Sequence, residues 1–295
     1  MSKVLKFGGK SLASLHTNKN LLNIIKNYLE TSSLIIVISA IGNTTDLLLE
    51  LLEKAKNGKP YNDELHELKV LNCYPQINTE EHFKLIENIL QGVSLIQDYS
   101  LKVQDLLLAQ GELISSKVVT QLLLNQGLDA TFVNSTQLIK TDAYFTAANV
   151  NETLTELAIK TEFEKLADKK LIVLGGFIGS TTENEITTLG RNGSNLTAAL
   201  IAKYTQAEEF LNFTHVDGIY TANPEWVASA KRIQQLNYSE ANELATFGAS
   251  ILHAKTIVPL IENKIPLRIL NTLNPESTGT LISAEPTPNG VKSLT

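Results

Sequence analysis

The sequence predicts an α/β fold in which a mostly parallel sheet lies between two layers of helices. Short apolar runs alternate with longer amphipathic segments along the 295 residues, as expected for strands joined by helical crossovers. The run Leu-Ile-Ile-Val-Ile at 34–38 contains no polar residue, which is typical of a strand buried on both faces. This length allows one large domain or two small ones, and the hydrophobic content of 43% is enough to form a sizeable core.

Each predicted strand is a short apolar run, and each predicted helix is a longer segment with apolar residues three or four apart. The predicted strands are 4–7, 34–39, 130–133, 171–174, 210–213 and 267–270. The predicted helices are 12–29, 45–56, 101–125, 152–166, 195–204 and 249–262. Residues 61–98 interrupt this alternation with polar-faced helical segments, for which we expect a helical hairpin packed on the body of the domain. From residue 284 the composition turns to Pro, Asn and Gly, which is typical of a linker.

The composition excludes several classes of protein. The formal net charge of −6 argues against nucleic-acid binding, which needs a basic surface. No apolar run approaches the roughly 18 residues of a membrane span, and the first residues show no signal-peptide pattern. The single cysteine, Cys73, excludes an intrachain disulfide framework, and the histidines lack metal-ligand spacing, so no protein-held metal is expected. We therefore expect a cytoplasmic protein.

Two segments have the pattern of anion-binding sites. Residues 187–195, Thr-Thr-Leu-Gly-Arg-Asn-Gly-Ser-Asn, place Arg191 directly before an apolar helix, whose first N–H groups can receive an anion. The Arg191 guanidinium has a planar fork suited to a carboxylate or phosphate. Near the start of the chain, a predicted strand ends in Gly8-Gly9-Lys10-Ser11, where glycine lets the backbone approach a ligand closely. Two such sites predict two anionic ligands held face to face.

Several motifs, in order along the chain, resemble those of the aspartate kinase family. Residues 6–11, Lys-Phe-Gly-Gly-Lys-Ser, resemble the family's KFGGTS opening, and 187–195 are similar to its TTLGRGGSD motif. Residues 214–224 resemble its TDVDGVYTADP segment, and Ser39-Ala40 with Thr45, and Gly111-Glu112, match its SA…T and GE pairs. This resemblance covers about residues 1–283. It implies an amino-acid-kinase-like fold, a three-layer αβα sandwich with a substrate-binding N-terminal half and an ATP-binding C-terminal half.

The resemblance implies transfer of the γ-phosphoryl group of ATP to the side-chain carboxylate of L-aspartate. The product would be 4-phospho-L-aspartate, in the first step of lysine, threonine and methionine biosynthesis. A carboxylate with a pKa of about 4 is already ionised at neutral pH, so the nucleophile needs alignment and cations but no general base. Mg²⁺ is expected to arrive with ATP and to keep several of its waters. The resemblance also implies a homodimer.

The resemblance assigns substrate residues. Arg191 is expected to bind the α-carboxylate of aspartate with a bidentate pair of hydrogen bonds, and Glu112 to accept from its α-ammonium group. The remaining substrate contacts are expected from Ser39, Thr45, Ser194 and Asn195. Serine and threonine also serve as ordinary helix caps, which is the alternative for the first two of these residues.

The ATP site is expected at the first glycine-rich turn and at 214–224. Lys6 would bridge the reacting carboxylate and the γ-phosphate, and it is assigned as catalytic together with Lys10 and Arg191. Gly8 and Gly9 would donate their N–H groups to phosphate oxygens. The other predicted ATP contacts are Thr214, His215, Asp217, Tyr220, Ser250 and Ile251. For the tyrosine, which is expected against the ribose or base, the alternative is packing in the core.

Some positions depart from the family pattern. Asn195 and His215 replace aspartates, and Glu225 and Ser250 stand where the family carries basic residues that aid the ATP phosphates. Lys10 stands where the family has threonine. We hypothesise that Lys10 supplies the cation that is lost at the other two positions.

The resemblance leaves the subfamily and some alternatives open. Residues 89–95 resemble the insert of aspartokinases fused to homoserine dehydrogenase, so that subfamily is the expected closer match. Residues 1–283 would then be the catalytic domain, and 284–295 a linker with the truncated start of a regulatory ACT domain. The alternatives are a sibling kinase acting on glutamate, or a non-catalytic module of a fused enzyme that binds ATP or an amino acid.

Overall fold

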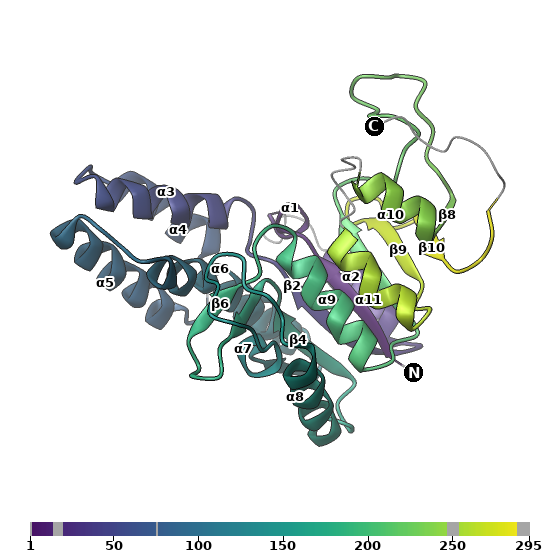
Figure 1. The fold of residues 1–295 in the computed structure, drawn as a ribbon, viewed down its shortest axis with the longest axis horizontal. Helices are drawn as coiled ribbons and strands as arrows, with labels where there is room; N and C mark the ends of the chain where they lie inside the picture. Colours follow the sequence, from purple (N-terminus) through teal and green to yellow (C-terminus); the bar gives the residue numbers. More distant parts are fainter. Residues whose placement is uncertain (1, 14–19, 75, 247–253, 288–295) are drawn as a thin grey trace.

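The computed structural model describes residues 2–13, 20–74, 76–246 and 254–287. Its centre is an eight-stranded sheet with the order β3-β4-β2-β1-β7-β9-β10-β8 (Figure 1). Neighbouring strands are parallel except β9 and β10, which pair antiparallel. The strands are β1 (Ser2–Phe7), β2 (Ser33–Ile38), β3 (Ala130–Val133), β4 (Leu171–Gly175), β7 (Glu209–Thr214), β8 (Gln235–Asn237), β9 (Leu267–Asn271) and β10 (Thr280–Ser283). A separate hairpin consists of β5 (Ile178–Ser180) and β6 (Ile186–Thr188).

Helices cover both faces of this sheet. Because strand residues alternate between faces, Leu5 and Phe7 pack into one apolar cluster and Val4 into another. The first cluster is formed with α2 (Asn20–Leu29), α3 (Thr44–Lys56), α4 (Asn62–Asn72), α5 (Glu80–Ile96) and α6 (Leu101–Asn125). The second involves α7 (Ser135–Leu138), α8 (Glu152–Lys165), α9 (Gly193–Tyr204), α10 (Tyr238–Thr246) and α11 (Ala254–Glu262). The three-layer, mostly parallel α/β fold is therefore confirmed, and none of the described helices is long and apolar enough to cross a membrane.

The predicted elements agree closely with the described ones. All six predicted strands are present, and the segment 61–98 contains α4 and α5, which with α3 form an arm at the left of Figure 1. The ion pairs Lys54–Glu64 and Lys69–Glu87 join helices within this arm. The predicted helix at 12–29 is wrong at its start, because α1 (Gly9–Leu12) ends at Leu12. Residues 14–19 of this prediction lie outside the described residues, and α2 is described from Asn20. The predicted start of the helix at 249–262 lies outside the described residues, and α11 is described from Ala254.

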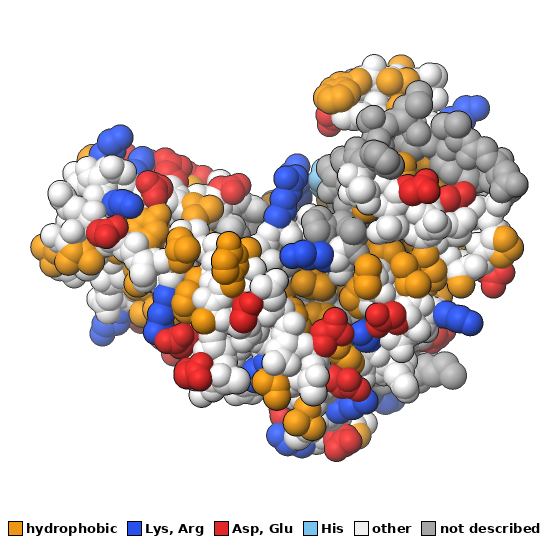
Figure 2. All heavy atoms as spheres, in the orientation of Figure 1, with side chains coloured by type: hydrophobic (Ala, Val, Ile, Leu, Met, Phe, Trp, Pro, Cys, Tyr) orange, Lys and Arg blue, Asp and Glu red, His pale blue; other side chains and the backbone are white. Residues whose placement is uncertain are grey.

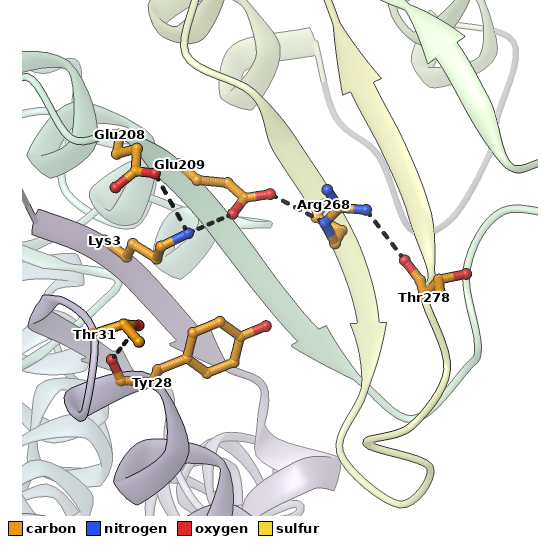
Figure 3. Close-up of polar contacts among 7 residues, drawn as sticks. All are labelled: Lys3, Tyr28, Thr31, Glu208, Glu209, Arg268 and Thr278. Carbon is orange, nitrogen blue, oxygen red and sulfur yellow. Dashed lines mark hydrogen bonds and ion pairs between the residues drawn. The ribbon is translucent and has the colours of Figure 1, made fainter.

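A charged network fastens the amino ends of three adjacent parallel strands (Figure 3). Lys3 Nζ of β1 lies 3.0 Å from Glu209 Oε2 of β7, and Glu209 Oε1 lies 3.0 Å from Arg268 Nε of β9. The Lys3 ammonium also lies 3.8 Å from Glu208 and 6.0 Å from the centre of the Tyr28 ring. Ligands of parallel α/β sheets bind beyond the carboxyl ends of the strands, so this network lies at the edge away from the expected site.

Candidate functional site

Two adjoining clefts lie at the carboxyl ends of the central strands. The first, of about 600 Å³, and the second, of about 390 Å³, share Lys6, Gly9, Asn192 and Asn195. Figure 2 shows this face hollowed between the α3–α5 arm and the C-terminal half, with basic side chains and histidine at the hollow. The first cleft is lined by every predicted substrate residue: Ser39, Thr45, Glu112, Arg191, Ser194 and Asn195. The second is lined by the predicted phosphate-binding residues Lys6, Gly8, Gly9, Lys10, Thr214 and His215.

Lys6 lies where the two clefts meet. It is the penultimate residue of β1, and its side chain lies on the same face of the sheet as Val4. Only 9% of the residue is exposed. Burial lowers the pKa of Lys6 to about 8, against the opposing effect of the Glu112 carboxylate. A lysine with this environment gains strongly from an anionic ligand, because such a ligand restores the stabilisation that water would give.

Glu112 presents an unsatisfied carboxyl oxygen to the first cleft. Its Oε1 accepts from Ala40 N at 3.2 Å, whereas its Oε2 is buried and has no hydrogen-bond partner in the described part of the chain. Burial raises the pKa of Glu112 to about 8, while the Ala40 N–H and the Lys6 charge act to lower it. Gly111 makes this geometry possible, since a Cβ there would lie 3.0 Å from Ala40 Cβ. The free oxygen is suited to a cationic hydrogen-bond donor such as an ammonium group.

The segment before α9 supplies the opposite charge. Arg191 lies exposed at the rim of the first cleft, and no ion pair to it occurs among the described residues. Asn192 has the left-handed backbone conformation (φ 63°) at the N-cap of α9 and turns the chain into the helix. Ser194 packs against Gly176 so closely that a Cβ at Gly176 would lie 2.6 Å from Ser194 Cβ. Asn195 is buried, and its Oδ1 is a second acceptor with no partner among the residues described.

Asn212 is a buried residue of the second cleft that the sequence analysis did not select. It lies opposite Lys6 in the β1–β7 register, is 3% exposed, and its Oδ1 has no partner within the described ranges. A signal for it existed, because an amide stands inside the apolar run Phe-Leu-Asn-Phe at 210–213. Three unpartnered acceptors, those of Glu112, Asn195 and Asn212, thus line the two clefts.

The second cleft is dominated by basic groups. Burial lowers the pKa of His215, the positive charge of Lys10 lowers it further, and Glu225 acts to raise it. The charges of Lys10 and Glu225 therefore lie close enough to act electrostatically on His215. Gly8 N donates to Phe213 O at 3.2 Å, which leaves the Gly9 N–H as the candidate phosphate donor of the glycine pair.

Two of the predicted ATP residues do not line this cleft. Asp217 accepts from Asn271 Nδ2 at 2.8 Å and from Asn274 Nδ2 at 3.1 Å, so it ties the loop to the end of β9. Tyr220 forms a β-bridge with Arg232, and neither Asp217 nor this tyrosine lines the second cleft. The two remaining predictions, Ser250 and Ile251, lie outside the described residues.

Other cleft residues come from segments without a recognisable motif. Thr146 and Phe177 line the first cleft with the unusual positive φ values of 72° and 68°. Gln104 and Leu108 line it from α6. No pattern in the sequence distinguishes these residues from ordinary loop and helix positions.

The described residues of the second cleft offer few ligands to a metal ion. The lining of the second cleft contains no carboxylate, and no cluster of three His, Cys, Asp or Glu side chains occurs in the described part of the chain. A divalent cation at this site would therefore be held by the phosphates of a nucleotide and by water.

This chain is similar in sequence and structure to known proteins. The model of the amino acid kinase family matches residues 1–271. The chain belongs to this family. Lysine-sensitive aspartokinase 3 of Escherichia coli is 33% identical over 290 residues, and the bifunctional aspartokinase/homoserine dehydrogenase of Buchnera aphidicola is 28% identical over 297 residues. Crystalline E. coli aspartokinase III in complex with aspartate and ADP superposes with a TM-score of 0.86 at 29% identity.

These relatives are longer than the matched region. Each alignment covers 95% of this chain but 63% of the E. coli enzyme and 36% of the Buchnera protein. The superposition covers 97% of this chain and 65% of the E. coli crystal structure. Both single-function and fused aspartokinases occur among the relatives at similar identity, so the comparison does not select the fused subfamily.

Proposed function

We propose that this chain transfers the γ-phosphoryl group of ATP to the side-chain carboxylate of L-aspartate. The observation that carries the proposal is the position of Lys6, which lines both clefts at the point where they meet. One cleft offers Glu112, Asn195 and Arg191 to an amino acid, and the other offers basic groups to phosphates. The E. coli relative that binds aspartate and ADP supports the same assignment.

The first cleft has complementary groups for both ends of an amino acid. The buried Glu112 Oε2 and Asn195 Oδ1 accept from the α-ammonium group, and Arg191 donates to the α-carboxylate. An arriving ammonium stabilises the ionised form of Glu112, whose pKa is about 8 without it. Substrate binding below pH 8 therefore displaces a proton from Glu112.

The reaction needs charge relief rather than a base. A side-chain carboxylate oxygen attacks the γ-phosphorus, the new O–P bond forms, and the bond to the β-γ bridging oxygen breaks to release ADP. Lys6 lies between the two anions and reduces their repulsion as they approach. The ammonium must be protonated to do this, so kcat/KM, which reports the free protein, is expected to fall above its pKa of about 8.

Lys10 supplies a further positive charge to the phosphates in this proposal. It lines the second cleft, and its charge acts on the pKa of His215 in the same cleft. Glu225 also acts on His215, so an acidic residue stands near the phosphate site where the family motif has a base. Lys10 offsets this negative charge.

The proposal is tested by trapping the acyl phosphate with hydroxylamine while ADP release is followed. Aspartate-dependent hydroxamate, with equal ADP, is the expected result. Product with glutamate but not aspartate would move the assignment to a sibling kinase. ATP binding without turnover of either amino acid would favour a non-catalytic module. Fusion to further domains and a homodimer remain predictions, and light scattering of the purified protein tests the second.

A further inference from the structure

Asp105 is a buried carboxylate beneath the amino-acid cleft. It lies on α6, two turns before Glu112, and none of its surface is exposed. Its Oδ2 accepts from Thr146 N and Thr188 N, both at 2.9 Å, and its Oδ1 accepts from Thr188 Oγ1 at 2.7 Å. One side chain of α6 thus binds two segments that are distant in sequence, and both of its partners line the first cleft.

The two segments held by Asp105 border the Arg191 turn. Thr188 is the last residue of β6, three positions before Arg191, and its carbonyl accepts from Ala148 N at 2.9 Å. Thr146 has a left-handed backbone conformation, which is unfavourable for a β-branched residue. Its carbonyl packs against Gly190, where an added Cβ would lie 3.1 Å away.

The charge of Asp105 is not explained by an ion pair. The described residues provide it with no cationic partner at salt-bridge distance, and burial raises its pKa while the three hydrogen bonds oppose that rise. A buried, unpaired carboxylate is costly unless its hydrogen bonds fix something that the molecule needs. Here they fix the distance between α6, which carries Glu112, and the turn that carries Arg191.

We propose that Asp105 is a positioning residue for the amino-acid substrate, which it serves by holding Thr146 and Thr188 so that Arg191 and Glu112 face one ligand. The inference rests on the proposed kinase function. It concerns the amino-acid cleft alone, because neither Asp105 nor its two partners line the phosphate cleft.

The test compares Asp105→Ala with Asp105→Asn. The alanine variant loses all three hydrogen bonds, so its KM for aspartate is expected to rise by roughly tenfold or more with the KM for ATP changed less than about twofold. The asparagine variant is expected to restore the wild-type KM. Its Oδ1 can accept both N–H groups while its Nδ2 donates to the Thr188 hydroxyl, which rotates to accept.

Lys102→Ala is the matched control. Lys102 of α6 forms an ion pair with Glu185 in the β5–β6 hairpin, the hairpin that carries Thr188. Loss of this exposed pair weakens the contact between α6 and the hairpin at a point away from the cleft. Both KM values should remain at the wild-type level in this control. An alanine variant at Asp105 that raises both KM values equally, or neither, would overturn the proposal, as would an asparagine variant no better than alanine.

Two further measurements keep the proposal testable under other outcomes. If Asp105→Ala does not fold, Thr188→Val removes only the hydroxyl contact and should raise the KM for aspartate by about threefold. Hydrogen exchange at the Thr146 and Thr188 amides should be faster in Asp105→Ala and unchanged in Asp105→Asn and Lys102→Ala. This exchange readout stands even if the wild-type protein makes no aspartyl phosphate, so failure of the kinase proposal is recognised separately.

Discussion

Replacing Glu112 with glutamine should stabilise the free protein and impair it as an enzyme. In the folded chain the pKa of Glu112 is about 8, compared with 4.5 for an ordinary glutamate. Between these values the unfolded state has released a proton that the folded state retains, so stability falls as the pH rises from about 4.5 to 8. At 1.36 kcal/mol per pH unit, the free energy of unfolding of the wild type falls by about 3 kcal/mol between pH 4.5 and pH 7. Glu112→Gln cannot ionise at this position and should not show this fall.

Urea denaturation of both proteins across pH 4.5–9 measures this difference. The glutamine Oε1 can still accept from Ala40 N, so the packing of the variant is preserved. The free energies of unfolding of the wild type and Glu112→Gln, plotted against pH, should diverge as the pH rises and run parallel above pH 8. Curves that are parallel throughout would refute the reasoning, because Glu112 would then ionise as an exposed glutamate does.

Lys6 provides an independent check at higher pH. Its folded pKa of about 8 lies below the ordinary 10.5, so between these values the unfolded state binds the extra proton and stability rises with pH. Lys6→Met should remove this rise. Because it also removes the charge that lowers the pKa of Glu112, the fall in stability should extend to a higher pH than in the wild type. In the activity assay, Glu112 and Lys6 should together give a bell-shaped dependence of activity on pH, centred near pH 8. The two apparent pKa values belong to the coupled pair rather than to either residue. Glu112→Gln should lose the ascending limb and, since the charge that receives the ammonium is gone, raise the KM for aspartate by roughly 10- to 100-fold.

Two other substitutions test the phosphate cleft and the packing behind the substrate cleft. Lys10→Thr should raise the KM for ATP by roughly tenfold, because a phosphate contact is lost. The control is Lys59→Thr, at an exposed position that lines neither cleft, and its KM for ATP should not change. Equal KM values for ATP in the two variants would contradict the role of Lys10. Gly176→Ala should lower the free energy of unfolding by about 1–3 kcal/mol, because its Cβ would meet Ser194 Cβ at 2.6 Å. The control is Gly92→Ala, inside α5, where no atom lies within 4 Å of the added methyl group. This variant should raise the free energy of unfolding by up to about 1 kcal/mol. A similar decrease in both variants would show that the contact with Ser194 is not the cause.

The sequence predicted the long elements and most of the cleft lining, for identifiable reasons. A fully apolar run such as 34–38 has few alternatives to a buried strand, and α6 was placed at its observed bounds of Leu101–Asn125. The short strands β5, β6, β8 and β10 were missed because each contains at most two hydrophobic residues, too few for a recognisable apolar run, and their partners define them. α7, with four residues, is too short to show a helical period. α10 was not predicted either.

The limits at the site have a similar origin. Asp105 could not be distinguished from a solvated helix charge, because only the tertiary fold brings Thr146 and Thr188 to it. Asp217 matched a motif, but its carboxylate is occupied by two asparagine amides, which a linear pattern does not reveal. Asn212, in contrast, stood out as an amide within an apolar strand and was recognisable in principle.

The central place of β1 has a consequence for how the chain acquires its shape during synthesis. β1 pairs with β2 on one side and with β7 on the other, and β7 (Glu209–Thr214) is made long after β1. At 5–20 residues per second, the second edge of β1 stays open for roughly 10–40 s. An open apolar edge invites pairing with another nascent chain, and a lysine on such an edge discourages it. We therefore expect Lys6 to disfavour such pairing until β7 covers this edge of β1.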